Sequence, residues 1–150
     1  MKYLYRGVNE EKYDELKGKL SPKKLFQKFS SHVCCDAPHA SCGSGVTCGE
    51  SNLNSVILHQ WKQKGYPTSG ISSTPHYERA KFYALHGGDA KKGYVFKLLI
   101  EALKSCGVAI YNVNKLINAP YILEDDEHIL VEKNFGPIPD IAIVDILIVD

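Results

Sequence analysis

The sequence predicts one domain of the α+β class, with helices mostly in its first half and strands mostly in its second. Its 150 residues are enough for one hydrophobic core and too few for two comfortable ones. The 44% hydrophobic and 23% charged residues are the proportions of an ordinary globular domain. Residues 53–64 and 75–85 carry apolar residues at helical spacing, whereas 127–132 and 141–149 have the apolar patterns of strands.

The first predicted elements are a strand and a short helix. Residues 3–8 alternate in character, as a half-buried strand does. Asn9 is a good N-cap for the next helix, and Glu10 and Glu11 place negative charge in its first turn. Gly18 is expected to end that helix.

Residues 31–50 are rich in Cys, Gly and Ser and are predicted to form a loop. This segment carries four of the chain's five cysteines, namely Cys34, Cys35, Cys42 and Cys48. Their spacing is not that of a zinc ribbon or finger, so no metal site is predicted. A metal clip that includes His32 and His39, one or two disulfides, and free thiols all remain open for this segment.

A glycine, small hydroxyl residues and a proline precede the helical pattern of residues 75–85. Thr74 is the expected N-cap and Pro75 the expected first helical residue, because proline has no N–H to leave unpaired there. Ser72 and Ser73 are then expected where an extended segment meets a helix N-terminus. Such a place gathers hydroxyls and backbone N–H groups, which suits a phosphate or a ribose.

The second half of the chain is richer in strand patterns. Residues 94–104 fit a strand or the start of a helix, which periodicity alone does not separate. Residues 108–113 and 127–132 are predicted strands. Residues 141–149 are apolar on both faces apart from Asp145, which predicts a central strand.

Charge and hydropathy argue against several classes of protein. The net charge is +1, from 18 basic and 17 acidic residues, which argues against nonspecific binding to nucleic acid because that needs a basic face. No apolar run approaches the roughly 18 residues that span a bilayer, so no membrane association is expected. The N-terminus lacks a signal-peptide core. We therefore expect a protein that is cytoplasmic or that enters a target cell without a classical signal peptide.

Three features follow one another along the chain: Arg6 in the opening strand, Ser72-Ser73-Thr74 before a helix, and the acidic run 124–127 entering a strand. This order resembles the mono-ADP-ribosyltransferases of the arginine–serine–glutamate class, which includes the cholera- and pertussis-type toxins and many bacterial effectors. Shorter matches to the family's motifs occur at Gly18-Lys19-Leu20-Ser21-Pro22-Lys23, Tyr94-Val95-Phe96, Ile110-Tyr111-Asn112-Val113-Asn114 and Gly136-Pro137-Ile138-Pro139. The resemblance covers nearly the whole chain except residues 31–50.

The resemblance implies a fold and an activity. The fold would be a single ADP-ribosyltransferase-like catalytic domain over residues 1–150, built as a split mixed β-sheet sandwich. The activity would use NAD as a substrate, releasing nicotinamide and transferring ADP-ribose to a protein side chain, most often arginine. A host or competitor protein would be the acceptor, and an immunity or activator protein is a further expected partner. The alternatives are an NAD glycohydrolase, a transferase that modifies a nucleic-acid base, and an inactive binding module of the same fold.

The resemblance also assigns roles to residues. Glu127 would stabilise the positive charge that develops on the ribose in the transition state. Arg6 would bind a phosphate or ribose of NAD through its planar guanidinium. Ser72 would orient Glu127 and contact the ribose on the nicotinamide side of NAD. Tyr121 and Asp125 would contact the acceptor, and an acid at position 125 resembles the arginine-modifying members. The further residues expected to bind NAD are Gly7, Ser73, Thr74, Phe82 and Tyr83.

Some positions depart from the family's pattern. Ile71 stands where an aromatic residue is common, Ser73 where threonine is common, and Asp125 where glutamate or glutamine is usual. Glu127 is also farther from the Gly136 turn than in the toxin subset. Glu124 and Glu132 therefore remain alternatives for the catalytic carboxylate.

Overall fold

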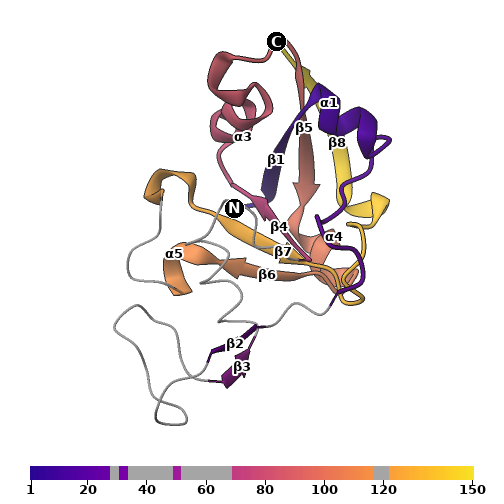
Figure 1. Ribbon diagram of the computed structural model, residues 1–150, viewed down its shortest axis with the longest axis vertical. Helices are drawn as coiled ribbons and strands as arrows, with labels where there is room; N and C mark the ends of the chain where they lie inside the picture. The colour runs from indigo at the N-terminus through magenta and orange to yellow at the C-terminus, as the bar shows by residue number, and fades with distance from the viewer. Residues whose placement is uncertain (28–30, 34–48, 52–68, 117–121) are drawn as a thin grey trace.

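Two three-stranded sheets form the frame of the computed structural model (Figure 1). The first has the order β1-β5-β8 and the second the order β4-β7-β6, while β2 and β3 form a separate pair. Their bounds are β1 Tyr3–Asn9, β2 Ser31–Val33, β3 Gly49–Ser51, β4 Gly70–Ser73, β5 Gly93–Leu99, β6 Ala109–Asn112, β7 His128–Val131 and β8 Ile143–Val149. The structure describes residues 1–27, 31–33, 49–51, 69–116 and 122–150.

The described α-helices are short and spread along the chain. They are α1 Glu10–Glu15, α3 Tyr77–Ala84, α4 Ile100–Ser105 and α5 Val113–Leu116, with 3-10 turns at His86–Gly88, Leu123–Asp125 and Asp140–Ala142. In the described part of the chain, no helix has the length and apolar character needed to cross a membrane.

The predicted α+β class is confirmed, but two details of the expectation are wrong for the described residues. Every described strand pair is antiparallel, so these sheets are not mixed. Three of the described α-helices lie beyond residue 75, so the helices that the structure describes do not concentrate in the N-terminal half. The helix expected over 53–64 falls outside the described residues.

The main hydrophobic core lies between the two large sheets, whose strands cross one another (Figure 1). Leu4 and Phe96 enter it from the first sheet, Ile71 and Leu130 from the second, and Leu103 from α4, all of them buried. Each such side chain stabilises the fold by about 1.5–3 kcal/mol when it leaves water. This packing holds β1 against the second sheet.

An isolated backbone bridge between Tyr5 and Thr74 joins the two large sheets. The N–H of Tyr5 donates to the carbonyl of Thr74 at 2.7 Å, and the N–H of Thr74 donates to the carbonyl of Tyr5 at 2.9 Å. Arg6 follows Tyr5, and Ser72 and Ser73 precede Thr74. These are residues that the sequence analysis assigned to the site. The bridge therefore places the functional parts of β1 and β4 side by side.

Helix α3 packs closely on the outer face of the first sheet. Ala80 and Ala84 are buried against Val95, as their helical spacing predicts. A Cβ on Gly7 would lie 1.9 Å from the carbonyl oxygen of Ala80, and one on Gly93 would lie 2.4 Å from that of Ala84. Two glycines on the strands thus let the helix backbone approach the sheet.

Helix α1 covers the opposite face of the same sheet. Asn9 caps it as predicted, because its side-chain oxygen accepts a hydrogen bond from the N–H of Lys12 at 2.7 Å. Tyr13 stacks on Tyr94 of β5, with ring centroids 3.7 Å apart. The first sheet is therefore covered by a helix on each face.

Several local expectations need correction. Strands at both ends of 31–50 replace part of the expected loop, and 94–104 holds both a strand, β5, and a helix, α4. Helix α3 starts at Tyr77 after an N-cap at His76, two residues later than expected, because the N–H and the carbonyl of Thr74 are paired with the backbone of Tyr5.

The expected position of the last strand in its sheet is wrong. β8 is an edge strand with Val144 and Ile148 50% and 67% exposed, not a central strand. An apolar pattern on both faces does not specify which strands pair with it.

Candidate active site

Arg6, Ser72 and Glu127 come together where the two sheets join. The Ser72 hydroxyl donates a hydrogen bond to Oε1 of Glu127 at 2.6 Å. Arg6 lies close enough to Glu127 for the charge of each to act on the pKa of the other. The three residues predicted to be catalytic, which are 121 positions apart at their extremes, thus occupy one place in the fold.

The strand register explains this meeting. In the β4–β7 pair, Ser72 is opposite Ile129 and Ser73 is opposite His128. Glu127 therefore immediately precedes His128, the first residue of β7 that pairs with β4. Asp126, which precedes it, has a left-handed backbone with φ of 42°, so the chain turns sharply between the acidic 3-10 turn and Glu127.

Burial dominates the electrostatics of the carboxylate. Glu127 is only 8% exposed. Burial raises its pKa above the ordinary carboxyl value, the Ser72 hydrogen bond and the Arg6 charge lower it, and the Asp125 charge raises it. Burial also lowers the pKa of Arg6, while the Glu127 charge raises it. A carboxylate removed from water in this way interacts strongly with a cation beside it.

Replacing Glu127 by glutamine is expected to raise the thermal unfolding midpoint at neutral pH. Its pKa is higher in the folded than in the unfolded state, so ionisation costs stability. That cost is absent below the unfolded pKa of about 4.3 and fully present above the raised pKa. Thermal unfolding followed by circular dichroism should show the glutamine variant more stable at pH 7, with the difference vanishing in acid. A variant less stable at pH 7 would contradict the prediction.

Ser73 and Thr74 use their hydroxyls inside the protein. The Ser73 hydroxyl donates to the carbonyl of His128 at 2.8 Å. The Thr74 hydroxyl donates to the carbonyl of Asp125 at 2.5 Å and accepts from the N–H of His76 at 3.1 Å. Of these three consecutive hydroxyl residues, Ser72 is the one whose hydroxyl reaches the carboxylate of Glu127, while the other two tie β4 to the segment that carries it.

The other residues predicted to bind NAD lie on or under α3. Gly7 is buried beneath the helix, where its missing Cβ serves the close packing of α3. Phe82 and Tyr83 are 46% and 39% exposed near the end of α3 and contact each other edge to face. The Tyr83 hydroxyl donates to the carboxylate of Asp125.

Asp125, predicted to contact the acceptor, is held by other residues of the chain. Its side chain accepts a hydrogen bond at Oδ1 from Nε of Arg79 at 2.6 Å and another at Oδ2 from Tyr83. Arg79 was not predicted from the sequence. Its spacing from Tyr83 places both on one helix face, but nothing in the sequence pairs that face with position 125. Tyr121, the other predicted acceptor contact, lies outside the described residues.

The alternative carboxylates have other surroundings. Glu124 is exposed on the 3-10 turn. Glu132 is buried, but its Oε2 accepts hydrogen bonds from the N–H groups of Asn134 at 2.8 Å and Gly136 at 3.0 Å. Glu132 therefore closes a turn at the far end of β7, and the geometry favours Glu127 for the catalytic role.

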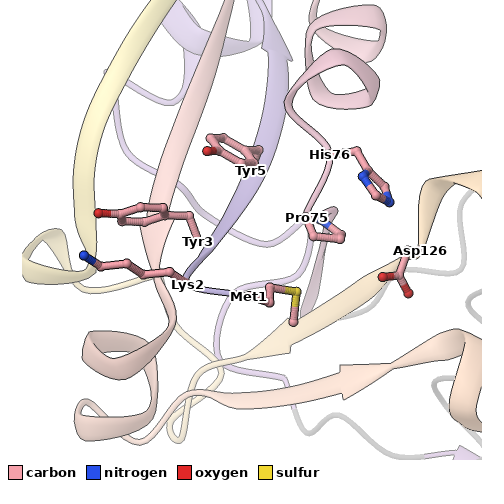
Figure 2. A pocket seen from close by; sticks show the side chains of 7 residues that line it. All are labelled: Met1, Lys2, Tyr3, Tyr5, Pro75, His76 and Asp126. Atoms are coloured by element: carbon pink, nitrogen blue, oxygen red, sulfur yellow. The ribbon is translucent and has the colours of Figure 1, made fainter.

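An open groove of about 420 Å³ lies beside this junction. Figure 2 shows Tyr3 and Tyr5 along one side of it and Pro75, His76 and Asp126 along the other. Met1 and Lys2 complete its lining. The groove thus offers aromatic rings opposite polar groups, next to the segments that follow Thr74 and precede Glu127.

Metal ligands do not gather in the described part of the chain, where no group of three or more His, Cys, Asp or Glu could hold an ion. The cysteines at 34, 35, 42 and 48 lie outside it.

Comparison with known protein families gives a match over most of the chain. The family model described as NarE matches residues 3–124. The matched span contains Arg6 and Ser72 and ends before Glu127. No curated protein matches the chain significantly.

Proposed function

The chain belongs to the NarE family, which is ADP-ribosyltransferase-like, and on that premise we propose that it transfers ADP-ribose from NAD to a protein side chain. The observation that carries the proposal is the hydrogen bond of 2.6 Å between Ser72 and Glu127 beside the charge of Arg6. The crossing of two small antiparallel sheets at this point supports an ADP-ribosyltransferase fold.

The proposed reaction begins with cleavage of the bond between the ribose anomeric carbon and the nicotinamide nitrogen. The bonding electron pair leaves with nicotinamide, which becomes neutral, and positive charge develops on the ribose. The buried carboxylate of Glu127 stabilises that charge more than it stabilises bound NAD, and this difference lowers the barrier. Low exposure strengthens the effect, since less water screens the two charges.

Arg6 and Ser72 have supporting roles in the proposal. The planar guanidinium of Arg6 binds a phosphate or ribose of NAD, which a lysine does not reproduce. Ser72 holds Glu127 through its hydroxyl. The acceptor then attacks the anomeric carbon, forms the new bond and loses its proton.

The acceptor is proposed to be an arginine side chain, as the resemblance to the mono-ADP-ribosyltransferases implies. One observation favours a second candidate, NAD glycohydrolase, in which water is the acceptor. Both oxygens of the Asp125 side chain accept hydrogen bonds from within the protein, from Arg79 and Tyr83. That carboxylate is therefore poorly placed to recognise an incoming guanidinium.

Incubation with NAD labelled in its adenylate part, in the presence of a cell lysate, tests both candidates. Transfer predicts free nicotinamide together with label on protein, and removal of that label by neutral hydroxylamine identifies arginine. Nicotinamide release with free ADP-ribose and no labelled protein supports the glycohydrolase. Absence of nicotinamide release under all conditions would contradict both.

A further inference from the structure

We propose that Arg79, Tyr83 and Asp125 form a positioning cluster that fixes Glu127 for the reaction, and that Asp125 does not contact the acceptor. This inference rests on the function proposed above. It concerns residues that act through Glu127 rather than on the substrate. The cluster is defined by the two hydrogen bonds that Arg79 and Tyr83 donate to Asp125.

Asp125 is fastened at both its side chain and its backbone. The residue is only 7% exposed. Its carboxylate is bonded to Arg79 and Tyr83 of α3, while its carbonyl accepts from the hydroxyl of Thr74 at 2.5 Å. The residue two positions before Glu127 is therefore tied to α3 and to the end of β4.

A left-handed turn at Asp126 connects the restrained Asp125 to Glu127. Asp126 has φ of 42°, a conformation that non-glycine residues adopt rarely. On its other side, Asp126 accepts hydrogen bonds from the amides of Asn112 and Asn114 at 3.4 and 3.3 Å. With its neighbours held, the backbone that presents Glu127 to Ser72 has little freedom to move.

The cluster also lies within electrostatic reach of the site. The charge of Asp125 raises the pKa of Glu127, and the phenol of Tyr83 acts on the pKa of Arg6. Tyr83 therefore interacts both with Asp125, through a hydrogen bond, and with Arg6, through its effect on the pKa of that residue. A change at the cluster is expected to reach the catalytic carboxylate through charge as well as through position.

Both donors keep their protons at neutral pH. Burial and the bond to Asp125 raise the pKa of Tyr83 to about 12, and the hydrogen bond to Asp125 raises the pKa of Arg79. The Arg79 guanidinium also lies over the rings of Phe82 and Tyr83, at 5.0 and 5.6 Å from their centroids. Arg79 thus compensates the negative charge that Asp125 would otherwise place, buried, near Glu127.

Steady-state nicotinamide release by Arg79→Gln and Asp125→Ala tests the positioning role. The kcat of both variants is expected to fall about 10- to 100-fold, since a small misplacement of a catalytic group has effects of that size. The KM for NAD and the KM for an acceptor should stay near their wild-type values. Arg79→Lys should recover part of the loss. Thermal unfolding checks that each variant is folded.

Opposite pH shifts give a readout that a merely structural role would not produce. Arg79→Gln leaves the Asp125 charge uncompensated, so the pKa of Glu127 rises and the acid limb of the kcat profile moves to higher pH. Asp125→Asn removes that charge and retains an oxygen for Arg79, so the same limb moves to lower pH. The control is Glu10→Gln, which breaks the exposed Lys92–Glu10 pair of 3.0 Å and should change neither kcat nor the pH limb.

The same shifts can be measured without turnover. Carbon-13 NMR of the Glu127 carboxyl follows its titration directly in each variant. If wild-type protein releases no nicotinamide, the proposed function fails, and the NMR titrations still judge the cluster. The positioning role is overturned by shifts of the same sign in both variants, or by Asp125→Ala raising the acceptor KM while the rate of nicotinamide release with NAD alone is unchanged.

Discussion

Replacement of Glu127 by glutamine is expected to reduce nicotinamide release from NAD by about 10²- to 10³-fold, the usual loss when one preorganised charge-stabilising group is removed. Glutamine fits the same space and still offers Ser72 an oxygen, so binding of NAD should persist. The loss should therefore appear in kcat rather than KM. In the wild type, the rate should fall as the pH drops through the raised pKa of Glu127, because only the ionised carboxylate stabilises the cation.

Two matched variants separate Glu127 from its acidic neighbours. Glu124→Gln changes an exposed carboxylate on the preceding turn and should leave the rate near that of the wild type. Glu132→Gln changes the residue that bonds the N–H groups of the following turn, so it should alter stability more than chemistry. A rate lost in the Glu132 variant at unchanged stability, and kept in the Glu127 variant, would move the catalytic role to Glu132.

Substitution of Gly7 by alanine is expected to destabilise the fold by about 3 kcal/mol, at the upper end of the usual cost of overpacking. The new Cβ would lie 1.9 Å from the carbonyl oxygen of Ala80 and 2.8 Å from the backbone nitrogen of Ala84. Both neighbours are backbone atoms of α3, so relief requires the helix itself to move. Urea unfolding measures the loss directly.

The control for Gly7 is Gly88→Ala. A Cβ at Gly88 meets nothing within 4 Å, but its φ of 102° is unfavourable for alanine, so a loss of about 1 kcal/mol is expected from backbone strain alone. Because α3 carries Arg79 and Tyr83, a displaced helix in the Gly7 variant should also slow nicotinamide release. Equal stabilities of the Gly7→Ala and wild-type proteins would show that the helix is not packed as closely as described.

Local chemistry made much of the first strand and helix predictable. The alternation of residues 3–8 and the capping side chain of Asn9 act over a few residues, so the sequence contains the whole signal. The edge position of β8 depends instead on which strands pair, and its apolar residues are compatible with either place. The late start of α3 has a similar cause, since the backbone of Thr74 is paired with that of Tyr5, 69 positions away.

Some residues of the candidate site could likewise be predicted from the sequence, and others could not. Arg6, Ser72 and Glu127 were identified because their types and order resemble a family, and the fold brings them together. Arg79 escaped notice because its partner is 46 positions away and its helix face looks solvent-exposed in the sequence. The role expected for Asp125 came from its position before Glu127, while its actual contacts depend on where α3 lies.

The junction of Arg6, Ser72 and Glu127 is proposed to bind NAD, and equilibrium dialysis of labelled NAD tests this most directly. The Glu127→Gln protein, which should bind NAD without cleaving it, is compared with the same protein carrying Arg6→Gln. We predict saturable binding at one site per chain in the first and a large loss of affinity in the second. Absence of saturable binding to the Glu127→Gln protein, or equal affinity in the two proteins, would contradict the account.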